Sequence, residues 1–200
     1  RSGFLEEACE DLFYQMVHRL ERVGELSKET VFLDGTKLEA CANKYTFVWK
    51  KSVGKWEEKM FIKIQEAVRL VNQEFIQSFR VGTEYRVQDL RKICRFLEEI
   101  CRERNIEFVH GRGKRKSIEQ RYLELFQRYL KRQTTYDWHT ASFQGRNNYC
   151  KTDPDATFMH MKDDHMRNAQ LKPGYNVQIG VDSEYIVAVD IFQDRNDVWS

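Results

Sequence analysis

Residues 31–40 have the sequence Val31-Phe32-Leu33-Asp34-Gly35-Thr36-Lys37-Leu38-Glu39-Ala40. Residues 30–40 are predicted to form a β-strand, because an apolar, β-prone run leads into a single carboxylate. Asp34 is expected at the end of that apolar run. A carboxylate held there suits a hard cation such as Mg²⁺, which takes oxygen ligands and leaves room for a phosphate. An ordinary Asp-Gly turn that ends a strand is the alternative.

Helices are predicted on both sides of this strand. Residues 3–26 have apolar side chains at helical spacing, and a short β-prone run follows at 45–49. Gly54 is expected to interrupt the chain. Three further stretches then have apolar stripes at spacings of three and four, and no proline occurs before Pro154. These stretches are 55–79, 87–104 and 118–133, and they are expected to pack as a helical hairpin or bundle.

The pattern changes to β-structure near the C-terminus. Residues 156–161 are predicted to form a short strand, and Lys172-Pro173-Gly174-Tyr175 a turn. Residues 176–181 and 185–192 are predicted to form a β-hairpin around a tight connection at 182–184. The order of strand, helical block and hairpin predicts an α/β domain with a helical insertion.

Composition limits the class of protein. Hydrophobic residues make up 41% of the 200 residues, which suits a globular core and not a disordered chain. The five cysteines include no CxxC pair and are interpreted as small core residues in a reducing compartment. No apolar run approaches the roughly 18 residues of a membrane span, and no signal-peptide pattern begins the chain. A cytoplasmic protein without a membrane partner is therefore expected.

Charge is unevenly distributed although the formal net charge is only +2. Residues 102–132 contain ten Lys/Arg against four Asp/Glu, whereas residues 150–200 contain five against nine. The basic run has the composition of a DNA-phosphate contact, and its expected contact residues are Arg112, Lys114, Arg115 and Lys116. Lys37 belongs to a second basic group close to Asp34 and is also expected to contact DNA. A solvated loop is the alternative for both groups.

Three stretches in order resemble the landmarks of one family. They are the Asp34 stretch of residues 31–40 with residues 42–50, then Lys151-Thr152-Asp153-Pro154-Asp155-Ala156-Thr157-Phe158-Met159, then Lys172 to Gln178 with its continuation to Asp190. Together they resemble the bacterial insertion-sequence transposases of the DDE type. The resemblance covers roughly a quarter of the chain, and the helical block resembles the family's insertion more loosely.

The resemblance implies a ribonuclease H-like mixed sheet with a helical insertion after the first catalytic strand. It divides the chain into an N-terminal helix (1–28), the first catalytic strand region (29–50), the helical insertion (51–149) and the hairpin part of the core (150–200). It also implies an Asp-Asp-Glu triad that holds two Mg²⁺ or Mn²⁺ ions and cleaves and joins transposon-end and target DNA.

Within that triad Asp34 matches the first acid. The resemblance places the second Asp and the Glu beyond residue 200, so the chain is expected to be a fragment of the catalytic domain. Alone it is expected to be inactive, because one carboxylate does not hold two ions. The parent protein is expected to form a homo-oligomer.

Two alternatives remain open at this point. One is a non-catalytic DNA-binding or assembly module, or a decayed transposase remnant, whose DNA binding ignores Asp34 and Mg²⁺. The other is a ribonuclease H-like nuclease of the host. A phosphatase of the haloacid dehalogenase type is rejected, because Phe32 occupies the position of its nucleophilic aspartate.

Overall fold

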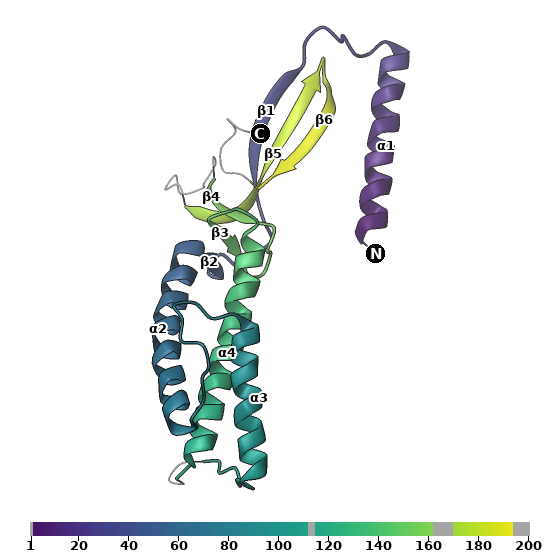
Figure 1. The fold of residues 1–200 in the computed structure, drawn as a ribbon. Coiled ribbons are helices and arrows are strands. Elements are labelled where there is room, and N and C mark those ends of the chain that lie inside the picture. Colours follow the sequence, from purple (N-terminus) through teal and green to yellow (C-terminus); the bar gives the residue numbers. More distant parts are fainter. Residues whose placement is uncertain (1, 112–114, 162–169, 194–200) are drawn as a thin grey trace. The chain divides into compact units, whose positions relative to one another are not determined.

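The computed structural model describes residues 2–111, 115–161 and 170–193. The chain forms two compact units, a sheet unit of Arg1–Phe47 with Tyr149–Ser200 and a helical unit of Val48–Asn148. Four helices and antiparallel sheets in this part of the chain make it a mixed α/β protein, as predicted (Figure 1). The strand pairs of the four-stranded sheet are antiparallel within the described residues, so the mixed sheet expected from the resemblance is not observed there.

The sheet unit begins with helix α1 (Ser2–Val23) and strand β1 (Phe32–Glu39). Strand β4 (Thr157–His160) and the long strands β5 (Leu171–Asp182) and β6 (Tyr185–Phe192) follow much later in the sequence. β5 is the central strand, with β1 along one edge and both β4 and β6 along the other (Figure 1). The predicted β5–β6 hairpin is confirmed, with its turn at Ser183, where φ is 58°.

The predicted turn at residues 172–175 is wrong, because this segment lies within β5. Pro173 accepts a hydrogen bond from the Ala40 amide at 2.9 Å, and Gly174 pairs with Glu39 on one edge and with Thr157 on the other. A Cβ atom at Gly174 would lie 2.6 Å from the carbonyl oxygen of Leu38. Gly174 therefore serves a close approach of two strands, which a Pro-Gly pair in the sequence does not distinguish from a turn.

The helical unit consists of α2 (Lys50–Glu74), α3 (Val87–Glu103) and α4 (Ile118–Phe143). The short strands β2 (Phe47–Trp49) and β3 (Asn148–Cys150) pair with each other. The predicted stripes form one bundle core, in which several side chains are fully buried: Ile64, Val68, Val71, Leu90, Leu97 and Phe126. Each contributes about 1.5–3 kcal/mol through its burial.

Several helix boundaries differ from the prediction: α1 ends at Val23 and not at 26, and α2 ends at Glu74 and not at 79. α2 begins at Lys50 and includes Gly54, because Val53 already belongs to the buried stripe and a single glycine only weakens a helix. α4 continues ten residues past the predicted end at 133. Thr134 and Thr135 there donate their hydroxyl protons to carbonyls four residues earlier, which makes them compatible with the helix. α4 ends where Gln144 adopts the left-handed conformation (φ 46°).

The cysteine prediction holds in part. Cys94, Cys101 and Cys150 are buried, and all five cysteines are free thiols. Cys9 and Cys41 are exposed, so they are not the core residues that the sequence suggested. Burial raises the pKa of the Cys94 thiol to about 11, with a smaller contribution from the negative charge of Glu98. Cys94 therefore packs as a neutral apolar side chain.

Candidate functional site

Asp34 is the third residue of β1, so it lies inside the strand and not at its end. Its side chain is exposed, and no hydrogen bond or ion pair to its carboxylate occurs in the described part of the chain. It pairs with Ile179 of β5, which in turn pairs with Val189 of β6. The carboxylate is thus free to accept an external ligand.

One face of the sheet surrounds Asp34 with apolar side chains. Alternation along a strand puts Phe32, Thr36 and Leu38 on the same face as Asp34, and cross-strand partners share a face. Phe32 is 68% exposed and Leu38 is 54% exposed, so this face is open among the described residues. The carboxylate of Asp34 is therefore reached by solvent and by a cation from this open face.

The alternative of an Asp-Gly turn at Asp34 is wrong. Gly35 continues β1 and pairs with Gln178, and its φ is not positive. A Cβ atom at Gly35 would lie 2.5 Å from the amide nitrogen at the end of the Gln178 side chain. Gly35 therefore leaves room for that side chain on the face opposite Asp34.

Further acids do not gather around Asp34 in the described residues. Asp190 pairs with Gln178, which puts it on the opposite face, and its carboxylate accepts a hydrogen bond from the Ile191 amide. Glu39 also lies on that opposite face and pairs with Lys172 at 2.8 Å. Asp163, Asp164, Asp194 and Asp197 lie outside the described residues. Among the residues described, no three His, Cys, Asp or Glu side chains are close enough to hold a metal ion.

Lys37 is not brought to the side of Asp34. It is three residues further along β1 and pairs with Asn176, so strand alternation directs it to the other face. Its proximity to Asp34 in sequence therefore does not make one joint binding surface. A phosphate contact by Lys37 would be made from the face that carries Gly35 and Gln178.

The basic loop belongs to the helical unit. Arg112 and Lys114 lie outside the described residues, and Arg115 is exposed. Lys116 already has a partner, because its ammonium group lies 2.6 and 2.9 Å from the two carboxylate oxygens of Glu124. This pair holds the chain just before α4, where Ser117 caps the helix. Lys116 is therefore less available to DNA than the sequence suggested.

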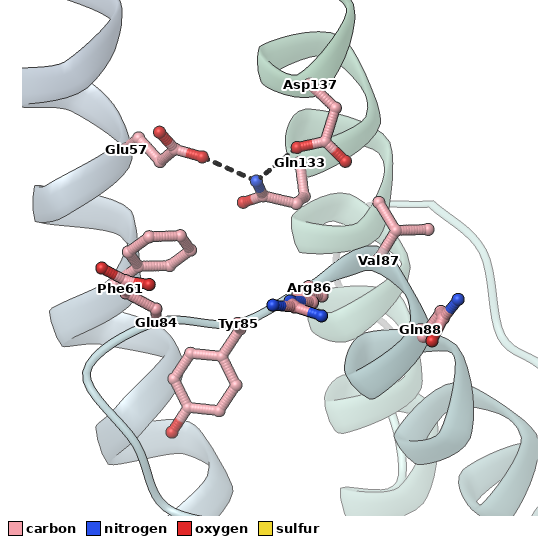
Figure 2. Close-up of a pocket in the computed structure, with 9 residues that line it drawn as sticks. All are labelled: Glu57, Phe61, Glu84, Tyr85, Arg86, Val87, Gln88, Gln133 and Asp137. Carbon is pink, nitrogen blue, oxygen red and sulfur yellow. Dashed lines mark hydrogen bonds between the residues drawn. The ribbon is translucent and has the colours of Figure 1, made fainter. Parts of the chain in front are cut away.

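A cavity in the helical unit is a second candidate site, and it was not predicted from the sequence. Glu57 of α2 and Gln133 and Asp137 of α4 line a cavity of about 480 Å³ together with the segment 84–88 (Figure 2). The sequence feature that could have indicated this cavity is a glutamine in the apolar stripe of α4, because Gln133 follows Phe126 and Tyr129 at helical spacing. In the structure Gln133 is only 3% exposed. A polar residue at a core position indicates either a satisfied network or a binding site.

Comparisons with protein-family models, with curated proteins and with solved structures gave no match to this chain. The part of the chain that the structure describes contains no helix of the length and apolarity required to cross a membrane.

Proposed function

We propose that this chain is part of a DDE-type transposase with a ribonuclease H-like core, in which Asp34 is the first metal-binding acid. One observation carries the proposal: the three motif stretches occupy three neighbouring strands. The Asp34 stretch forms β1, residues 172–178 belong to β5, and residues 153–159 lead into β4. The first stretch is more than a hundred residues from the other two, yet β1 lies next to β5 and β5 lies next to β4, as expected of motifs that build one site.

The strand register shows which residues of the three stretches lie next to one another. Gly174 of the third stretch lies between Glu39 on β1 and Thr157 on β4. The Tyr175 hydroxyl donates to the Asp153 carboxylate at 2.6 Å, which links the second and third stretches. The resemblance requires the Asp34 strand to lie beside the hairpin of residues 175–192, and the pairing of β1 with β5 satisfies this requirement.

The chemistry would be metal-dependent cleavage and strand transfer of DNA. The exposed carboxylate of Asp34 offers one or two of the six oxygens that Mg²⁺ or Mn²⁺ takes, and DNA phosphate and water supply others. Further acids are needed to hold two ions firmly. Asp34 would act by fixing one ion next to the scissile phosphate, in a homo-oligomer that brings transposon ends and target together.

The experiment measures how Mg²⁺ changes DNA affinity at constant ionic strength. Binding of a short labelled duplex is followed by fluorescence anisotropy for the full chain, for Asp34→Asn and for Glu39→Gln. Glu39 is the control carboxylate, because it lies on the same strand but on the opposite face, where Lys172 already pairs with it. We expect Mg²⁺ to tighten binding by the wild type and by Glu39→Gln but not by Asp34→Asn. Equal responses of all three variants would overturn the proposal.

A second candidate, a non-catalytic DNA-binding module, is favoured by a row of lysines on α2. Lys51, Lys55, Lys59 and Lys63 recur every four residues and are exposed, and none has an ion pair within the described residues. The first turn of α2 contains no acid, although cations at a helix N-terminus oppose its dipole. Lys51 in the first turn therefore does not stabilise the helix through its dipole, and the row as a whole has the charge to contact DNA phosphates.

The same titration separates the two candidates. The second predicts DNA binding that falls steeply with salt and ignores both Mg²⁺ and Asp34→Asn. Replacing all four lysines by glutamine would then flatten the salt dependence, by about 0.9 in the log–log slope for each DNA phosphate that these lysines neutralise. A slope that stays the same in the fourfold variant would exclude the α2 row as the DNA-binding surface.

A further inference from the structure

The cavity in the helical unit is built from three segments that are distant in sequence. α2 contributes Glu57 and Phe61, α4 contributes Gln133 and Asp137, and the segment before α3 contributes Tyr85 and Arg86, among other residues (Figure 2). Its volume of about 480 Å³ lies in the range of small-molecule sites. All of these residues belong to the helical unit, so the cavity lies within one compact body.

One buried amide joins two carboxylates in this cavity. The side-chain nitrogen of Gln133 donates to Glu57 at 2.6 Å and to Asp137 at 2.9 Å (Figure 2). Neither carboxylate has a Lys or Arg partner within hydrogen-bonding range in the described residues. Two negative charges therefore face one neutral amide, an arrangement that favours a further positive charge beside them.

The amide oxygen of Gln133 is the second observation. Gln133 is 3% exposed, and its Oε1 atom accepts no hydrogen bond from the described residues. The two carboxylates fix the amide orientation, because exchange of nitrogen and oxygen would oppose oxygen to oxygen. Figure 2 shows Oε1 directed from α4 toward α2, which carries Glu57 and Phe61. A buried acceptor without a donor is costly to the fold, so a donor group of a ligand that reaches Oε1 would stabilise it.

A second buried glutamine of α4 provides the contrast. Gln120 is 2% exposed, and its Oε1 accepts from the Val109 amide at 3.0 Å. Its nitrogen donates to the Val109 carbonyl and to Glu124. Gln120 is thus fully satisfied and fixes a loop to the helix. Gln133 differs, because its side-chain nitrogen donates two hydrogen bonds while its Oε1 atom accepts none from the described residues.

Aromatic rings complete the cavity wall. Phe61 and Tyr85 lie with their ring centroids 6.2 Å apart. Ring faces attract cations, most strongly when water is excluded. Carboxylates, an amide oxygen and aromatic rings form the recognition chemistry of an alkylammonium or guanidinium group, whereas a metal ion would need a third close carboxylate or histidine.

We propose that this cavity binds an organic cation with an alkylammonium or guanidinium group. Its charge lies against Glu57 and Asp137, an N–H group complements Oε1 of Gln133, and its alkyl stem contacts Phe61 and Tyr85. Arg86 also lines the cavity and has no ion pair among the described residues, so its positive charge opposes entry of the ligand. The same chemistry is offered by a free diamine and by the arginine or lysine side chain of a polypeptide.

The experiment titrates the full chain with agmatine, 1,5-diaminopentane and a capped arginine amide, and follows the side-chain amide signals of Gln133 by NMR. 1-Pentanol is the neutral probe of similar length. We expect saturable shifts of the Gln133 amide with the cations and none with the alcohol. Binding of agmatine without the capped arginine identifies a free small molecule, and binding of both identifies side-chain recognition. Both results support a cation site.

Matched variants decide whether the cavity is responsible. Glu57→Gln and Asp137→Asn should each weaken agmatine binding by about ten- to a hundredfold, whereas Glu66→Gln, an exposed carboxylate of α2 outside the cavity, should leave it unchanged. Arg86→Gln should tighten binding, a gain that misfolding does not imitate. The proposal is overturned if no cation saturates the Gln133 signals up to about 10 mM, or if Glu57→Gln and Glu66→Gln behave alike.

Discussion

Replacing Gly174 by alanine should destabilise the meeting point of the three motif stretches. The added Cβ atom would lie 2.6 Å from the carbonyl oxygen of Leu38, a backbone atom that moves only with strand β1. Overpacking of this kind costs about 1–3 kcal/mol. The effect should concentrate on the β1–β5 pairing, because Gly174 lies opposite Glu39 at one end of that ladder.

Native-state hydrogen exchange measures this cost directly, since the β1 amides exchange through opening of the sheet. A loss of 1–3 kcal/mol corresponds to roughly 5- to 150-fold faster exchange of these amides. Gly35→Ala is the matched control on the same strand pair, because its Cβ meets only the end of the Gln178 side chain, which can rotate away. Exchange in Gly174→Ala no faster than in Gly35→Ala would show that the contact with Leu38 does not constrain residue 174.

Three further predictions concern separate parts of the chain. Gly54→Ala should stabilise the helical unit by about 0.5–1 kcal/mol in denaturant unfolding, because Gly54 lies inside α2 and open space surrounds its Cβ position; unchanged stability would contradict this. Ser117→Ala should cost about 1 kcal/mol in the same assay through loss of the α4 N-cap, and Ser117→Asp should restore it. Asp182 should titrate far below an ordinary aspartate, because hydrogen bonds from the Ser27 hydroxyl and from the Ser27 and Lys28 amides lower its pKa to about 2. Its folded-state pKa is below the unfolded value of about 3.9, so its stabilising effect is present above pH 4 and lost as the pH falls through 2. The amide shifts of Ser27 and Lys28 should follow this titration, and a midpoint near pH 4 would count against it.

Much of the fold followed from local patterns. The stripes of α2, α3 and α4 and the alternation of β5 and β6 depend on neighbours in sequence, so periodicity predicts them. The segment 172–175 could not be predicted in this way, because the role of Gly174 is a close contact with Leu38, which is more than a hundred residues away. Long-range contacts of this kind override local turn signals.

The candidate sites also divide into local and long-range features. Asp34 could be selected as a candidate from the sequence because its strand and its motif are local features. Its neighbours in the sheet depend on register, which put Lys37 and Asp190 on the opposite face. The cavity in the helical unit was missed, because it joins Glu57 to Gln133 across 76 residues. Only the polar residue in the α4 stripe hinted at it.

Mn²⁺ relaxation of the NMR signals of the full chain tests most directly the proposal that Asp34 is a metal-binding acid on an open sheet face. We expect that Mn²⁺ broadens the signals of Asp34 and of Ile179 beside it, that Asp34→Asn abolishes this broadening, and that Glu39→Gln preserves it. Broadening that is centred elsewhere, or that persists unchanged in Asp34→Asn, would contradict the claim.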